Sequence, residues 1–113
     1  PSKLAEIKKA KKAGYKIYLY FVCTDNAQIN IKRVRSRVEK GGHAVDVNKI
    51  KSRYGKTLRN LYPSIKLANR VYLFDNSGKT LELIAEIFDG GLQLKAGSLP
   101  DWFVEFVLSH YEV

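Results

Sequence analysis

The sequence is poor in residues that hold metals or form disulfides. It has one cysteine, Cys23, two histidines and no methionine in 113 residues. A lone cysteine cannot form an internal disulfide, and no His/Cys spacing typical of a zinc site surrounds it. No apolar run approaches the roughly 18 residues that span a bilayer, and no secretory leader pattern is present. We therefore expect a cytoplasmic protein with no metal site of its own and no membrane partner, in which Cys23 is a small buried side chain.

Charge is abundant and unevenly distributed. The net charge is +9, but residues 1–70 carry 18 basic and four acidic residues, a net of +14. Residues 71–113 carry two basic and seven acidic residues, a net of −5. A basic segment followed by an acidic one predicts a polyanion site in the first part. Nucleotide phosphate and nucleic acid both satisfy this prediction, and charge alone does not choose between them.

Hydrophobic patterns predict a single α/β domain over residues 1–113. Residues 15–22 are apolar on both alternating faces, which is typical of a strand covered by helices on both sides, as in a parallel sheet. Around this strand we expect a helix over 3–13, a second buried strand over 70–75, and a β-hairpin formed by 80–88 and 92–95. A last apolar helix should begin with a capping box at Ser98 and pack on the sheet or on another chain.

Between the two predicted strands, two helical patterns flank Gly41-Gly42-His43. Apolar residues at steps of three and four mark one stripe on each helix. Arg33 and Arg37 lie off the first stripe, and Arg53 lies at the border of the second. The pattern predicts a helical hairpin that presents several guanidinium groups to one place, which suits a polyphosphate ligand. The alternative is that these arginines are solvated and bind nothing specific.

The ordered combination of motifs resembles the zeta-toxin-type P-loop kinases. The similarity runs from about residue 2 to residue 88, and it rests on Arg33-Val34, Arg37-Val38, Gly41-Gly42-His43, Val45, Ile50, Arg53-Tyr54, Leu58, Asn60-Leu61 and Asp75-Asn76-Ser77. The resemblance implies a partial P-loop kinase-like fold. Its parts would be a parallel sheet with flanking helices, a helical lid over about 27–62, and a C-terminal β-hairpin and helix.

The resemblance also implies an activity, which is phosphoryl transfer from ATP with Mg²⁺. In that interpretation Arg37 and Arg53 are catalytic, and together with Arg33 and His43 they form the phosphate-binding part of the lid. His43 would act as a hinge residue. The loop of Asp75, Asn76 and Ser77 would pass near the nucleotide base. The alternative is that Asn76-Ser77-Gly78 is a plain hairpin turn. A small antitoxin is a possible partner.

One part of the family pattern is absent, because the sequence contains no G-x-x-x-x-G-K-[ST] phosphate loop. The chain therefore looks like the C-terminal half of such a kinase. The alternative is a non-catalytic fragment or degenerate relative that binds anions or nucleic acid. A missing central strand would leave one edge of the 15–22 strand unpaired, for an N-terminal half or a second copy to cover. Nucleic acid is the less favoured ligand, because Tyr15, Tyr18 and Tyr20 are expected to be buried.

Overall fold

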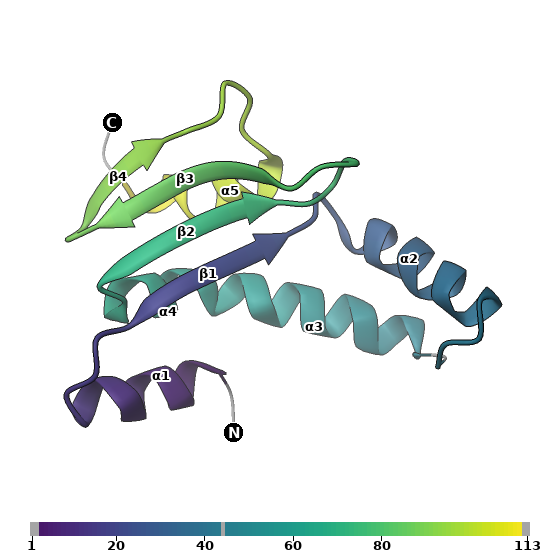
Figure 1. Ribbon diagram of the computed structural model, residues 1–113, viewed down its shortest axis with the longest axis horizontal. Helices are drawn as coiled ribbons and strands as arrows, with labels where there is room; N and C mark the ends of the chain where they lie inside the picture. The colour runs from purple at the N-terminus through teal and green to yellow at the C-terminus, as the bar shows by residue number, and fades with distance from the viewer. Residues whose placement is uncertain (1–2, 44, 112–113) are drawn as a thin grey trace.

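The structure is a computed structural model that describes residues 3–43 and 45–111 (Figure 1). Its elements are α1 (Lys3–Lys12), β1 (Tyr18–Cys23), α2 (Ala27–Glu39), α3 (Val47–Arg59), α4 (Leu61–Leu67), β2 (Arg70–Asp75), β3 (Glu82–Phe88), β4 (Gly91–Leu94), α5 (Asp101–Phe106) and a 3₁₀ turn (Leu108–His110). The strands form one sheet in the order β1-β2-β3-β4. Strands β1 and β2 are parallel, and the other neighbours are antiparallel. The α/β class and the C-terminal hairpin are confirmed, but the sheet is mixed rather than parallel.

Strand β1 is shorter than predicted and is covered on one face only. It begins at Tyr18 rather than at residue 15. Leu19 and Phe21 pack against the core, whereas Tyr18 and Tyr20 are 61% and 63% exposed. The prediction of helices on both faces is therefore wrong. The cause lies in the residue type, because a tyrosine ring is apolar enough to look buried while its hydroxyl is satisfied by water.

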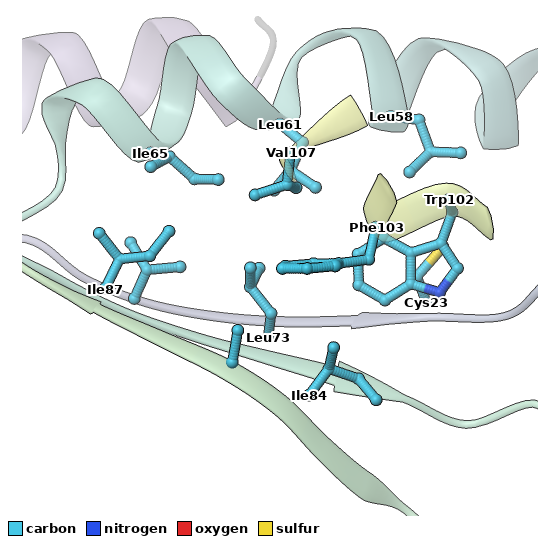
Figure 2. Close-up of a cluster of buried hydrophobic side chains, with 12 residues drawn as sticks. Cys23, Leu58, Leu61, Ile65, Leu73, Ile84, Ile87, Trp102, Phe103 and Val107 are labelled. Atoms are coloured by element: carbon cyan, nitrogen blue, oxygen red, sulfur yellow. The ribbon is translucent and has the colours of Figure 1, made fainter. Parts of the chain in front are cut away.

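The core fills the space between one face of the sheet and the helices α3, α4 and α5 (Figure 2). Trp102 and Phe103 of α5 are 2% and 0% exposed and lie against the sheet residues Leu73 and Ile84. Fully burying a large apolar side chain contributes about 1.5–3 kcal/mol. The last helix therefore docks on the sheet of its own chain. The predicted capping box at Ser98 does not form, because Pro100 is the N-cap residue and no side chain caps the helix.

Helices α2 and α3, with the loop between them, form the predicted helical hairpin. Side-chain oxygens of Asn26 and Asp46 accept backbone N–H groups at the two N-termini and so cap these helices. Gly41 ends α2 with φ +98°, a conformation that favours glycine. Helix α3 ends before Pro63, which lies in the first turn of α4. Backbone N–H groups of a first turn have no helical acceptor, so the N–H that proline lacks costs no hydrogen bond there. Residue 44, within the predicted lid range, lies outside the described residues.

Candidate functional site

A cleft of about 510 Å³ opens between α2, α3 and the carboxyl end of β1. Its lining is formed by Phe21, Val22, Cys23, Thr24, Asn30, Arg33, Arg37, Ile50, Arg53, Tyr54, Thr57, Leu58 and Asn76. We call it the arginine cleft, because the helical hairpin brings Arg33, Arg37 and Arg53 to one opening. The carboxyl ends of strands are where ligands collect in open α/β sheets. The three arginines that the sequence singled out therefore share one site.

The arginine cleft is electropositive. None of its lining residues is acidic. Among the described residues, ion pairs within 4.0 Å involve Glu86 with Arg70 and Lys95 and none of the cleft arginines. Guanidinium groups stay charged at any pH of interest and match the geometry of phosphate oxygens. An anion bound in this cleft would meet no carboxylate among the lining residues. The nearest acidic influence comes from Asp25 and Asp75, which act electrostatically on Cys23 and Tyr54.

The three arginines are held differently. Arg33 is half-buried, and its Nη2 donates to the carbonyl of Asn76 at 2.6 Å, with the carbonyl of Gly78 at 3.5 Å. This bond ties α2 to the loop after β2. Arg37 is exposed, and its Nε makes a long bond of 3.4 Å to the carbonyl of Arg33. In the described part of the chain Arg53 is exposed and makes no side-chain hydrogen bond. Arg33 is therefore a positioning residue, and Arg37 and Arg53 have most of their donors available.

The floor of the cleft contains a hydrogen-bond network around Thr24, which was not predicted from the sequence. The Tyr54 hydroxyl donates to the Thr24 carbonyl at 2.6 Å, and the Thr24 hydroxyl donates to Asn30 Oδ1 at 3.0 Å. These bonds join α3 and α2 to the end of β1. Burial raises the pKa of the Tyr54 hydroxyl, which keeps it a proton donor. The sequence placed Tyr54 in the apolar stripe of α3 and so gave no sign that its hydroxyl makes this hydrogen bond.

Cys23 lies beside the same carbonyl and confirms its prediction as a small buried side chain. Its thiol donates to the Thr24 carbonyl at 3.2 Å. Burial raises the pKa of the thiol to about 11. Because the thiolate is the reactive form, Cys23 is not poised as a nucleophile.

Of the three residues predicted near the nucleotide base, only Asn76 lines the cleft. The Asp75 carboxylate accepts hydrogen bonds from Trp102 Nε1 at 2.9 Å, from the Ser77 hydroxyl at 3.0 Å and from the Ser77 N–H at 3.2 Å. The Ser77 hydroxyl in turn accepts the Asp25 N–H at 2.7 Å. Asp75 and Ser77 therefore brace the loop from inside the protein. Trp102 is the unforeseen partner, because it lies 27 residues further along the chain.

His43 lies outside the arginine cleft. It is exposed in the loop between α2 and α3 and is not among the lining residues. This loop is at the far end of the helical hairpin from the sheet (Figure 1). A role for His43 in phosphate binding stays a prediction that would require the hairpin to move.

The described residues offer no set of ligands for the Mg²⁺ that the resemblance implies. They contain no group of three His, Cys, Asp or Glu side chains that could hold a metal. The cleft walls likewise supply no carboxylate, which is the ligand type that Mg²⁺ prefers in proteins. Within the same described ranges, no helix has the length and apolar character needed to cross a membrane.

The chain is similar to a protein of Haemophilus influenzae that is described as uncharacterized, with 32% identity over 51 residues. The matched segment is 45% of this chain and 36% of that relative, so it spans little more than a third of the relative's length. No family model matches the chain, and no solved structure matches it.

Proposed function

We propose that this chain binds the polyphosphate of a nucleotide such as ATP and supplies arginine side chains for phosphoryl transfer. The observation that carries the proposal is the convergence of Arg33, Arg37 and Arg53 on one cleft that has no acidic wall. Phosphoryl transfer depends mainly on positioning and on neutralising developing negative charge. Arg37 and Arg53 would contact phosphate oxygens, while Arg33 holds α2 against the loop after β2.

The chain provides only part of a phosphate cradle in this proposal. Its sequence has no G-x-x-x-x-G-K-[ST] loop, which would surround phosphates with backbone N–H groups. We therefore infer that the chain alone binds ATP weakly and that turnover needs a second phosphate-binding element from another polypeptide segment. A non-catalytic anion-binding module is the rival proposal. Such a module would bind ATP in the same cleft. It would show no ATP turnover even when a second phosphate-binding element is supplied.

The binding test compares cleft variants with a matched control on the same helix. Arg37→Ala and Arg53→Ala each remove one guanidinium group from the cleft. Arg35→Ala removes the same charge from an exposed position of α2 that does not line it. A hydrogen bond to a charged group contributes about 1.5–3 kcal/mol, and 1.4 kcal/mol is about tenfold in affinity. Isothermal titration with ATP at low salt should show a loss of about tenfold or more for the cleft variants and less than twofold for Arg35→Ala.

A competition experiment tests which part of the nucleotide is recognised. Inorganic tripolyphosphate should displace ATP, and adenosine should not, because the cleft recognises charge. Equal losses of ATP affinity in Arg37→Ala, Arg53→Ala and Arg35→Ala would mean that ATP binding depends only on the net charge of the protein. That result would refute the proposal. Displacement by adenosine without displacement by tripolyphosphate would refute it as well.

A further inference from the structure

One face of the sheet carries exposed aromatic rings, and no helix of the described residues covers it. Its side chains, which we call the open face, are Tyr18, Tyr20, Arg70, Tyr72, Glu86 and Phe88. The strand register places Tyr18, Arg70 and Phe88 in one row across β1, β2 and β3. Tyr20, Tyr72 and Glu86 form the next row. Phe88 is 57% exposed, and both tyrosines of β1 are exposed to a similar extent. None of these six residues lines the arginine cleft. Tyr20 lines a second hollow, which lies beside β1.

The open face is an ordered platform of π-systems. The rings of Tyr20 and Tyr72 stack with centroids 4.8 Å apart and 11° between their planes. The Arg70 guanidinium lies 5.4 Å from the Tyr72 ring and 5.1 Å from the Phe88 ring. Aromatic and guanidinium groups therefore run without interruption across β1, β2 and β3. Along β1, Tyr18 and Tyr20 are two residues apart, roughly 6.6 Å, so two flat ligands can stack on separate rings.

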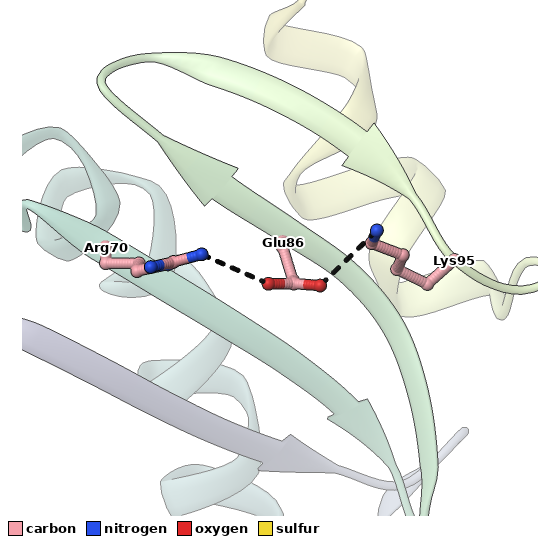
Figure 3. Close-up of polar contacts among 3 residues, drawn as sticks. All are labelled: Arg70, Glu86 and Lys95. Atoms are coloured by element: carbon pink, nitrogen blue, oxygen red, sulfur yellow. Dashed lines mark ion pairs between the residues drawn. The ribbon is translucent and has the colours of Figure 1, made fainter.

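The surroundings of the open face are basic. Glu86 lies between Arg70 at 3.8 Å and Lys95 at 3.5 Å, so its charge is compensated (Figure 3). Arg70 Nε has no hydrogen-bond partner among the described residues. Beyond the outer edge of β1 lies α1 (Figure 1), and a hollow of about 440 Å³ beside Tyr20 has the basic lining residues Lys3, Lys56 and Arg53. Arg53 lines the arginine cleft as well. Residues 3–16 contain six lysines and one acid.

We propose that the open face binds single-stranded nucleic acid, with bases stacked on Tyr18, Tyr20 and Phe88 and phosphates near the lysines of α1 and the adjoining hollow. Stacking on exposed aromatic side chains beside a basic surface is how many proteins hold single strands. The aromatic rings of this site lie outside the arginine cleft, although Arg53 lines both the cleft and the adjoining hollow. The stacking proposed here does not depend on the function proposed for that cleft. The expectation that made nucleic acid the less favoured ligand, buried tyrosines, is contradicted by their exposure.

A second copy of the chain is a poorer occupant of the open face. Two copies would each bring a net charge of +9. A dry interface would also have to desolvate Arg70, Glu86 and Lys95 at its centre, whereas interface cores are depleted of charged residues. A nucleic-acid strand instead gains from the positive charge and leaves these groups partly in water.

The test is fluorescence anisotropy of labelled U8 and dT8 single strands titrated with the full chain at low salt. Tyr20→Ala and Phe88→Ala should each weaken binding about tenfold, the order of effect for loss of one stacking ring. Tyr20→Phe keeps the ring and should stay within twofold. Val104→Ala is the matched control, because Val104 is exposed on α5, in the other layer. With ATP in excess, Tyr20→Ala should still weaken strand binding about tenfold relative to the wild type, which separates the stacking rings from the arginine cleft even though Arg53 lines both the cleft and the hollow.

The outcomes are distinct. Equal weakening of U8 and dT8 supports a stacking site that ignores the 2′-hydroxyl, and preference for U8 supports the same site with RNA as its ligand. Equal binding by all variants, or tighter binding of a duplex than of the single strands, would overturn the proposal, because charge alone would then explain binding. No binding by any strand, with a dimer in light scattering that Tyr20→Ala abolishes, would overturn it in favour of self-association.

Discussion

Replacing Asp75 with alanine should lower the free energy of unfolding by about 2–3 kcal/mol and leave the arginine cleft intact. The Asp75 carboxylate accepts the Trp102 indole N–H at 2.9 Å, and Trp102 is 2% exposed. A hydrogen bond to a charged group contributes about 1.5–3 kcal/mol, and the buried donor left behind in Asp75→Ala finds no water. The two bonds from Ser77 are made within the loop itself, whereas the bond from Trp102 ties the loop to α5.

Urea denaturation followed by circular dichroism measures this loss, with Glu105→Ala as a control that removes an exposed acid from α5. Asp75→Asn keeps an acceptor oxygen and should lose about half as much. In a Trp102→Phe background the donor is gone, so Asp75→Ala should then cost less than about 1 kcal/mol. A loss within 0.5 kcal/mol of the control in the wild-type background would refute the bracing role. If Asp75→Ala weakened ATP binding and left stability unchanged, Asp75 would instead belong to the nucleotide-binding site.

Three further predictions concern the floor of the cleft. Tyr54→Phe removes the hydrogen bond to the Thr24 carbonyl and should lower the free energy of unfolding by about 1 kcal/mol in urea denaturation; an unchanged midpoint would contradict it. Cys23 should react with a thiol reagent at pH 8 far more slowly in the folded than in the urea-unfolded chain, and equal rates would disprove its burial. Burial raises its pKa from 9.0 to about 11, so stability from the protonated thiol is complete below pH 9 and declines toward pH 11. In Cys23→Ala this decline in the free energy of unfolding between pH 9 and pH 11 should be absent.

The sequence indicated which arginines share the cleft, but not which side chains meet in the loop beside it. Arg33, Arg37 and Arg53 could be placed together because each belongs to an amphipathic helix whose apolar stripe fixes the orientation of its other faces. The hydrogen bond between Asp75 and Trp102 could not be predicted, since it joins the loop to a helix that lies 27 residues further along the chain. The capping box failed for a local reason, because Pro100 took the N-cap position.

The sequence by itself determined the local features of this protein. The helical hairpin follows from periodic apolar residues on either side of a glycine turn, and the basic character follows from composition. Only the tertiary structure decided which face of the sheet stays open and which polar groups meet at Thr24 and Asp75. The physical reason is that exposure and hydrogen bonding depend on which distant segments pack together. A strand such as β1, rich in tyrosine, is compatible with either environment.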